Sequence, residues 1–265
     1  MLAQCKFEKL NKVPLVVISS KDCLTCDTER IVKSLKRVFP GIEPEYLFYP
    51  EKKAAKLVNK LGLRGLPAYI FNRSLESDAE FKNFRDNLEL QGDYYLLSYA
   101  KGGFSYFINR KKAPGKIDLF ISLFTKEAAE VLASMKELLP ALHFLAVKHE
   151  DGSFNAANGQ PEVEEYLRSV CVQKYYPQNF WDYNICRAKN ISSTWWEDCL
   201  KEKESVEQVR ICARSQEARL LLEENISLNN QLGVMFGPTY LMNNQEIFVS
   251  GSALDKKELK KIFKK

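Results

Sequence analysis

The chain has 265 residues, of which 45% are hydrophobic and 28% charged, so it can form one large domain or two ordinary ones with a real core. This composition excludes a mainly disordered protein. The net charge of +5 comes from 39 basic and 34 acidic residues spread along the chain, and it gives no reason to expect a nucleic-acid partner. Every apolar run falls short of the roughly 20 residues that a membrane helix needs, so no membrane span is expected.

Seven cysteines fall into two groups, three early and four late in the chain. They are Cys5, Cys23 and Cys26, then Cys171, Cys186, Cys199 and Cys212. The late four are spaced too widely for paired zinc ligands, and the chain has only two histidines, so we expect no metal and no other cofactor. Two disulfides suit the late group and predict an oxidising, extracytoplasmic compartment such as the periplasm or a secretory lumen. Four buried free thiols in a reducing compartment are the alternative.

No signal sequence is visible in Met1–Leu10, which lacks an apolar core of the required length. Leu2-Ala3-Gln4-Cys5 is only faintly similar to the cysteine-ending cleavage site of bacterial lipoproteins, since Gln4 stands where a small residue is expected. The extracytoplasmic location is therefore an expectation from the cysteines alone, and lipidation of Cys5 stays open.

The first half of the chain alternates predicted strands and helices. The strands are Val13–Ser20, Glu45–Tyr49 and Ala68–Phe71, and the helices are about Asp27–Phe39 and Glu51–Leu61. This order, with crossover helices, predicts parallel pairing at the start of a sheet. Phe81, Phe84 and Leu88 then mark an amphipathic stretch, and two strands, Tyr94–Tyr99 and Phe104–Ile108, are expected around Lys101-Gly102-Gly103.

A polar linker at residues 111–116 leads into a second half that repeats this order at the level of architecture. Its predicted elements are a strand Ile117–Ser122, a helix Lys126–Leu139, a strand Ala141–Val147, a helical region from about Pro161 to Asn230, strands Thr239–Met242 and Glu246–Ser250, and a helix Asp255–Lys265. We therefore predict an α/β protein with domains at residues 1–110 and 117–265, and a helical insert at about residues 156–230.

Cys23-Leu24-Thr25-Cys26 carries the candidate chemistry, because it follows a buried strand and opens a predicted helix. The free N–H groups and the dipole of a helix start stabilise a thiolate on the first cysteine. The second cysteine, one turn later, can close a disulfide with the first. A zinc site would need a second close pair of ligands. We expect Cys23 to be the exposed, reactive thiol and Cys26 to lie buried beneath it.

The CLTC motif after VPLVVISSKD, together with the segment Gly65-Leu66-Pro67-Ala68-Tyr69-Ile70-Phe71, resembles the thioredoxin superfamily. The resemblance implies that Pro67 follows a cis bond, faces the motif and aligns the substrate backbone. It also implies that Cys23, Cys26 and Pro67 are the catalytic residues. Two features depart from the family. Val13–Ile18 lacks the buried acid that thioredoxin uses in proton transfer, and no final helix is evident after the closing hairpin.

The second half resembles a DsbA-like thioredoxin domain, in which a helical subdomain precedes the proline strand. Gly237-Pro238-Thr239-Tyr240-Leu241 matches the proline segment, which implies a second cis bond, and NNQEIFVSG matches the closing hairpin. The CxxC position reads Leu123-Phe124-Thr125-Lys126, so the resemblance implies a domain without redox activity. The insert is also similar in part to the cysteine-bearing luminal segment of plant vacuolar sorting receptors, which we interpret as a shared structural insert.

Within the insert, Cys186 and Cys199 flank a turn at Asn190–Thr194, and two helices meeting there would bring them within disulfide distance. Cys171 and Cys212 would then pair in a nested pattern, with both bridges structural. Four cysteines allow three pairings, and the choice stays open. The aromatic residues Tyr175, Tyr176, Phe180, Trp181, Trp195 and Trp196 are expected in the core of the insert rather than in a peptide-binding groove.

Two functions compete at this point. The first is a thiol–disulfide oxidoreductase that acts on protein thiols or disulfides through Cys23 and Cys26, with an unidentified redox partner and a second domain that binds or positions clients. The second is a non-enzymatic scaffold or chaperone-like binding protein in which Cys23–Cys26 is a static bridge. The helix-start position of the motif favours the first. Leu24-Thr25 supplies no charge that favours a thiolate strongly, which argues against a strong oxidant.

Overall fold

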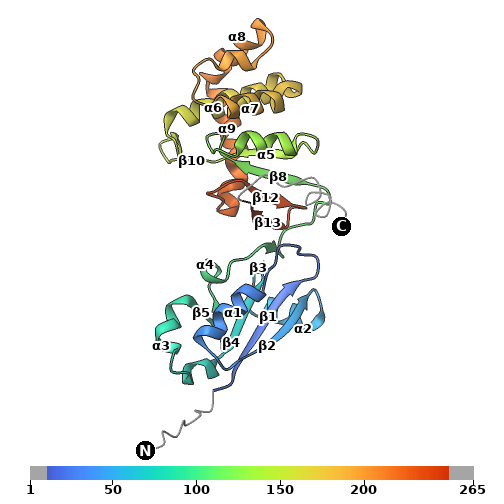
Figure 1. The fold of residues 1–265 in the computed structure, drawn as a ribbon, viewed down its shortest axis with the longest axis vertical. Coiled ribbons are helices and arrows are strands. Elements are labelled where there is room, and N and C mark those ends of the chain that lie inside the picture. The colour runs from blue at the N-terminus through green and yellow to red at the C-terminus, as the bar shows by residue number, and fades with distance from the viewer. Residues whose placement is uncertain (1–10, 251–265) are drawn as a thin grey trace, which may run out of the picture. The chain divides into compact units, whose positions relative to one another are not determined.

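The computed structural model describes residues 11–250, which form two compact units (Figure 1). Unit 1 contains the chain up to Lys112 and the short segment Gln245–Ile247. Unit 2 contains Ala113–Asn244 and the residues from Phe248 on. The division after Lys112 falls in the polar stretch of residues 111–116. Cys5 and the helix expected at Asp255–Lys265 lie outside the described residues.

Unit 1 is built on a five-stranded sheet with the strand order β2-β1-β4-β6-β5. The strands are β1 (Val13–Ser20), β2 (Ile42–Tyr49), β4 (Ala68–Asn72), β5 (Leu88–Gln91) and β6 (Tyr94–Leu97). The first two strands are parallel, as predicted, whereas β4 runs antiparallel to β1 and β6 runs antiparallel to β4 and β5. Because Ile18 pairs with Ala68, the end of β1 and the start of β4 meet at one edge of the sheet.

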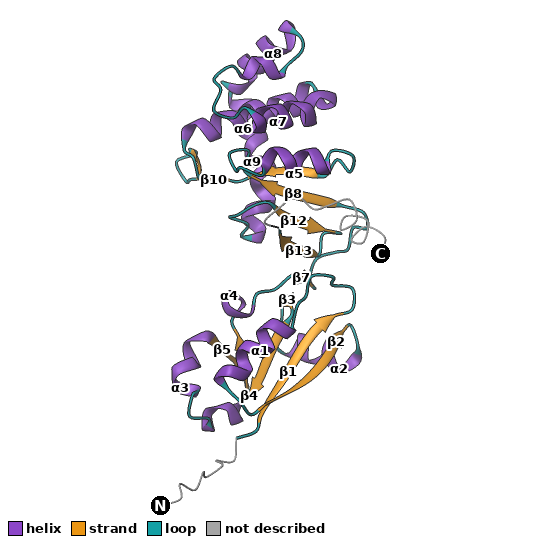
Figure 2. Ribbon diagram, viewed as in Figure 1, coloured by secondary structure: helices purple, strands orange, loops and turns teal. Residues whose placement is uncertain are grey.

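A helix packs on each face of this sheet, and both helices can be followed in Figure 2. They are α1 (Glu29–Val38) and α2 (Lys52–Lys60). Side chains alternate between the faces along β1. Leu15 and Val17 join the hydrophobic cluster that contains Leu35 of α1, whereas Ile18 joins the cluster that contains Ala54 of α2. The β-branched run of β1 is therefore buried on both sides, at the centre of the unit.

The chain between β4 and the end of unit 1 differs from the sequence prediction. Short helical turns occupy its first part: η1 (Arg73–Ser77), α3 (Phe81–Phe84) and η2 (Arg85–Asn87). Leu88 begins a strand and does not continue an amphipathic helix. The two strands predicted around Lys101-Gly102-Gly103 are present but shorter, and they do not pair with each other. β6 ends at Leu97, and the next residues form a helical turn, α4 (Tyr99–Gly102).

Two glycines explain this difference. Gly92, with a φ of 57°, lies in the two-residue connection between β5 and β6, so the tight hairpin forms ten residues before the predicted one. Gly103, with a φ of 65°, ends the helical turn α4. Of the predicted strand Phe104–Ile108, only β7 (Tyr106–Phe107) remains.

A smaller group of strands brings the segment Gln245–Ile247 into unit 1. β3 (Gly65–Leu66) pairs with β7, and β7 also pairs with Glu246, the first residue of β13 (Glu246–Val249). The N–H of Phe107 donates to the carbonyl of Gln245 at 2.7 Å, and the N–H of Ile247 donates to the carbonyl of Ser105 at 2.8 Å. Since β3 directly precedes Pro67, these bonds hold Glu246 beside the residues that lead into the turn at Leu66-Pro67, which we call the proline turn.

Unit 2 has a central strand, β8, with a parallel strand on one side and an antiparallel strand on the other. These strands are β8 (Ile117–Ile121), β9 (Ala141–Phe144) and β12 (Thr239–Met242), and α5 (Ala128–Met135) joins the first two. The predicted strand Ala141–Val147 is interrupted at Leu145. Its second part, β10 (Ala146–Lys148), pairs with β11 (Phe154–Ala156), a strand that the sequence pattern did not reveal.

Helices fill the segment between β11 and β12, as predicted. They are α6 (Gln160–Tyr175), η3 (Pro177–Asn179), α7 (Phe180–Lys189), η4 (Trp196–Cys199), α8 (Lys203–Ala213) and α9 (Gln216–Leu232). One disulfide joins Cys171 of α6 to Cys212 of α8, and another joins Cys186 of α7 to Cys199 of η4, in the nested pattern. None of the helices within residues 11–250 combines the length and the hydrophobicity needed to cross a bilayer.

Most of the large aromatic side chains of the insert lie in its core. Phe180, Trp181 and Trp196 are buried, as expected. The guanidinium groups of Arg168 and Arg210 lie over the Trp196 ring, 5.6 and 5.8 Å from its centroids. The expectation is wrong for Trp195, which is 71% exposed and precedes the short helix η4. It is also wrong for Tyr175, which is 36% exposed and whose hydroxyl donates to Glu217 at 2.7 Å.

Candidate redox site

The three residues expected to be catalytic lie together at one end of the sheet of unit 1. Cys23 and Cys26 form a disulfide with their Cα atoms 5.6 Å apart. The Leu66–Pro67 bond is cis, as predicted, and Pro67 is buried. The carbonyl oxygen of Leu66 lies 3.8 Å from the Sγ of Cys26. The proline turn therefore lies directly against the disulfide.

The motif departs from the prediction in one respect. Helix α1 begins only at Glu29, so Cys26 lies in the loop before the helix and not one turn into it. Both cysteines are half-buried in the disulfide, and the expected difference between an exposed Cys23 and a buried Cys26 stays a prediction for the reduced protein. Backbone bonds shape the loop: the N–H of Cys23 donates to the carbonyl of Ser20 at 3.2 Å, and the N–H of Asp27 donates to the carbonyl of Thr25 at 2.9 Å.

Asp27 explains where the helix begins. Its Oδ1 accepts hydrogen bonds from the N–H groups of Glu29 at 3.0 Å and Arg30 at 3.4 Å. A carboxylate at this place satisfies the free donors of the first turn and is favoured by the helix dipole. These two donors of the first turn are therefore engaged by Asp27 and are not available to the sulfur of Cys23.

A carboxylate from a distant part of the chain lies at the motif. Oε1 of Glu246 accepts hydrogen bonds from the N–H groups of Leu24 at 2.8 Å and Thr25 at 2.7 Å, and from the Thr25 hydroxyl at 2.8 Å. The same oxygen lies 3.7 Å from the Sγ of Cys23. The sequence analysis missed Glu246, because no local pattern signals a contact with a residue 223 positions away.

Charged side chains next to the motif form ion pairs, and within residues 11–250 they form no metal site. Lys112 pairs with Asp22 at 4.0 Å. Burial, followed by the charges of Asp22 and Glu246, raises the pKa of the Tyr106 hydroxyl. In the part of the chain that the structure describes, no three His, Cys, Asp or Glu side chains are grouped as metal ligands.

Unit 2 repeats the proline turn without the cysteines. The Gly237–Pro238 bond is cis, as predicted, and leads directly into β12. Leu123–Lys126 follows β8 at the place of the motif, and Leu123 is fully buried in the core of the unit. No thiol chemistry is available at this position.

A closed polar cluster lies next to that segment. Glu162 is fully buried and accepts hydrogen bonds from the hydroxyls of Ser122 and Tyr166. Its other oxygen accepts from the backbone N–H and the side-chain amide of Asn158 at 2.8 and 2.9 Å. Both oxygens are satisfied by groups of the protein, so the cluster holds the loop before α6 against the end of β8.

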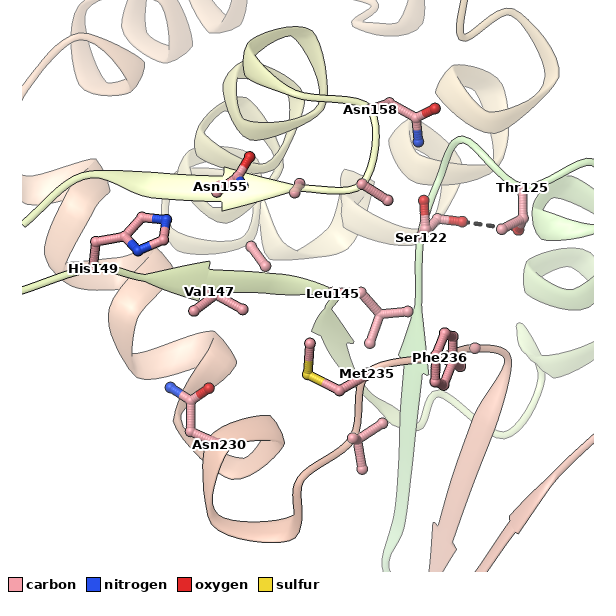
Figure 3. A pocket seen from close by; sticks show the side chains of 15 residues that line it. Ser122, Thr125, Leu145, Val147, His149, Asn155, Asn158, Asn230, Met235 and Phe236 are labelled. Carbon is pink, nitrogen blue, oxygen red and sulfur yellow. Dashed lines mark hydrogen bonds between the residues drawn. The ribbon is translucent and has the colours of Figure 1, made fainter.

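A cavity of about 540 Å³ opens beside the proline turn of unit 2 (Figure 3). Leu145, Val147, Met235 and Phe236 line its apolar part, and Asn155 is among its polar residues. Met235 is 61% exposed and Phe236 is 78% exposed. Large apolar side chains exposed at a cavity are typical of surfaces that contact another molecule.

The fold and the site of unit 1 together define a class of protein. A parallel β1–α1–β2 unit, an antiparallel β4, a CxxC disulfide after β1 and a cis-proline before β4 form a thioredoxin-like fold. Within such a fold, the disulfide occupies the loop between the first strand and the first helix. Unit 2 contains the helical insert and a second turn with a cis-proline, and neither belongs to unit 1.

No protein-family model and no curated protein matches the chain. Among solved structures it is similar to the oxidoreductase NmDsbA1 from N. meningitidis, at 13% identity and a TM-score of 0.40, over 61% of this chain and 89% of that one. It is also similar to Proteus mirabilis ScsC in a transitional conformation, at 15% identity and a TM-score of 0.38, over 90% and 94%. A periplasmic thioredoxin-like protein from Salmonella enterica serovar Typhimurium matches at 13% identity and a TM-score of 0.36, over 58% and 84%. At these identities and TM-scores the comparisons carry no argument about activity, so the activity of this protein has to be argued from its own residues.

Proposed function

We propose that the protein is a thiol–disulfide oxidoreductase that acts on protein thiols or disulfides through Cys23 and Cys26. The observation that carries the proposal is the position of their disulfide, half-buried in a loop and against the turn that contains Pro67. A structural bridge needs neither this exposure nor a neighbouring cis-proline. The two bridges of the insert, by contrast, join one helix to another.

The reductive direction of the reaction has two steps. The thiolate of Cys23 attacks one sulfur of a client disulfide, whose S–S bond breaks as the bond between Cys23 and the client forms, and the leaving client sulfur takes up a proton. Cys26 then loses its proton and attacks the Sγ of Cys23, which releases the second client thiol and closes the Cys23–Cys26 disulfide. Two electrons pass from the pair to the client. The reverse sequence oxidises a client dithiol, and a dithiol redox partner resets the pair after each reductive cycle.

We assign to Pro67 the alignment of the client backbone during this exchange. Support comes from its position next to the disulfide, with the preceding carbonyl, that of Leu66, 3.8 Å from the sulfur of Cys26. A client chain that reaches the disulfide along this edge meets the proline turn.

We further propose that residues 117–265 form a second thioredoxin-like domain after residues 1–110 and a linker at 111–116, with the helical insert at about 156–230. The parallel β8–α5–β9 unit and a β12 preceded by a cis-proline support this assignment. Without cysteines at its motif position, this domain binds or positions clients. The exposed side chains of Met235 and Phe236 at the cavity of unit 2 provide an apolar surface for that role.

An extracytoplasmic location completes the proposal. The structure contains three disulfides, and two of them join helices of the insert. Structural bridges of this kind persist in oxidising compartments and are rare in the cytosol.

Reduction of insulin, with dithiothreitol as the source of electrons, tests the function. Wild type and Cys5→Ser, a control that removes a cysteine outside the motif, are expected to catalyse the reaction equally. Cys23→Ser is expected to abolish catalysis, because no nucleophile remains to attack the client disulfide. Equal and negligible turnover by wild type and Cys23→Ser would instead support the non-enzymatic scaffold.

A further inference from the structure

One oxygen of Glu246 occupies the donors that a thiolate on Cys23 would otherwise use. The backbone N–H groups of Leu24 and Thr25 and the Thr25 hydroxyl all donate to Oε1, at 2.7–2.8 Å. Backbone N–H groups after the first cysteine of such a loop are the nearest dipoles that can stabilise its anionic sulfur. Here a carboxylate has taken their place as acceptor.

The position of Glu246 is set by the fold and does not depend on the motif alone. Its backbone pairs with Tyr106 of β7, and its neighbours Gln245 and Ile247 form backbone hydrogen bonds with the same strand region at 2.7 and 2.8 Å. The residue is only 5% exposed. Water therefore screens its charge poorly at the short distance that separates it from Cys23.

Reduction of the disulfide gives Cys23 two possible states, with different consequences. As a thiol, it can donate its S–H to Oε1 of Glu246, which lies 3.7 Å away. As a thiolate, it faces a negative charge at that distance, with the nearest backbone donors already engaged. Like charges this close disfavour the ionised form. Asp22, which precedes Cys23 in the sequence, is paired with Lys112 at 4.0 Å.

We propose, building on the function proposed above, that Glu246 keeps the Cys23 thiolate scarce and so makes the Cys23–Cys26 pair a reductant of client disulfides and not an oxidant of client thiols. A strong oxidant of this type owes its strength to a stabilised reduced form. Glu246 withholds that stabilisation. The disulfide is then the favoured state of the pair, and two electrons and two protons pass from the dithiol to the client disulfide.

The test compares the reduced proteins in the absence of any client. Wild type, Glu246→Gln, Glu246→Ala and the control Glu43→Gln, which removes a charge that pairs with Lys12 at the other end of β1, are titrated by thiolate absorbance. Each is then equilibrated with reduced and oxidised glutathione at pH 7. Gln keeps an acceptor for the two backbone N–H groups but removes the charge, whereas Ala also frees those donors.

In Glu246→Gln, the thiolate titration is expected to have its midpoint about one pH unit lower than in wild type. The equilibrium constant for reduction by glutathione is expected to rise several-fold, and a tenfold rise corresponds to about 30 mV. Glu246→Ala is expected to move both quantities at least as far, and Glu43→Gln to leave them at the wild-type values. Thr25→Val leaves the charge of Glu246 in place and removes a hydroxyl that lies 4.0 Å from the sulfur of Cys23, so it is expected not to lower the midpoint.

The inference is wrong if both Glu246 variants fold and keep the wild-type midpoint of the thiolate titration and the wild-type equilibrium constant with glutathione. Because these measurements use no client, they separate it from the proposed function. If insulin is reduced through Cys23 but the Glu246 variants titrate like wild type, the inference fails and the function stands. If insulin is not reduced but the Glu246 variants shift as expected, the function fails and the role of Glu246 stands.

Discussion

Removing the Cys171–Cys212 disulfide is expected to destabilise unit 2 more than removing the Cys186–Cys199 disulfide. The first bridge spans a sequence separation of 41 residues and the second spans 13. Loop-closure entropy in the unfolded chain then corresponds to about 3.9 kcal/mol for the first bridge and about 2.9 kcal/mol for the second. Burial acts in the same direction, because Cys171 and Cys212 are 0% and 2% exposed and their truncation leaves a cavity in the core.

The perturbation is a pair of double variants, Cys171→Ala with Cys212→Ala and Cys186→Ala with Cys199→Ala, so that no unpaired thiol remains. All three tryptophans of the chain lie in the insert. Their emission during urea unfolding without reductant therefore reports on the insert and not on unit 1. We expect the free energy of unfolding to fall by about 4 kcal/mol in the first variant and by about 3 kcal/mol in the second.

A larger loss in the second variant than in the first would refute the reasoning from loop length and burial. Losses below about 1 kcal/mol in both would show that the bridges do not stabilise the insert at all, against the usual cost of removing a native disulfide.

Three further predictions concern unit 2. Glu162→Ala leaves four hydrogen-bond donors without their acceptor and is expected to cost about 3 kcal/mol in urea unfolding; a loss below about 1 kcal/mol would contradict the role assigned to the cluster. Burial opposes ionisation of Asp118, yet hydrogen bonds from His143 and Lys116 hold its pKa below the ordinary value of 3.8. Its contribution to the free energy of unfolding is therefore present above pH 3.8 and is lost as the pH falls below that value. In Asp118→Asn, the free energy of unfolding should therefore fall less steeply with decreasing pH in this range. An unchanged slope would count against the ion pair. Phe236→Ser, at a side chain that is 78% exposed, should change stability by less than about 0.5 kcal/mol but raise the KM for a protein client; an unchanged KM would argue against client binding at this cavity.

The regular parts of the fold could be predicted because their residues carry strong local signals. β1 and β12 have the bounds predicted from their short apolar runs, and both are buried along most of their length. The start of α1 could not be placed, because Asp27 looks like a first-turn acid in the sequence, whereas its side chain caps the helix from the preceding loop. The hairpin was misplaced because the pair Gly102-Gly103 resembles a turn more than Gly92-Asp93 does.

The candidate site was predictable only in part, for a physical reason. Cys23, Cys26 and Pro67 are recognisable from their local segments, and the structure brings the three together. Glu246 is not recognisable in this way, because its place at the motif depends on the pairing of β13 with β7 and on no pattern around residue 246. The sequence therefore indicated a helix start as the environment of the nucleophile, whereas the structure also places the carboxylate of Glu246 beside it.

Trapping of a client on the enzyme tests the central claim most directly, that Cys23 exchanges disulfides with proteins. A Cys26→Ser variant lacks the thiol that resolves the mixed disulfide, so a disulfide-containing peptide should stay attached after the first step. Peptide mapping by mass spectrometry is expected to find the client joined to Cys23, with no adduct when Cys23→Ser is added. A protein that forms no adduct, or one joined to the client through Cys5, would contradict the assignment of Cys23 as the nucleophile.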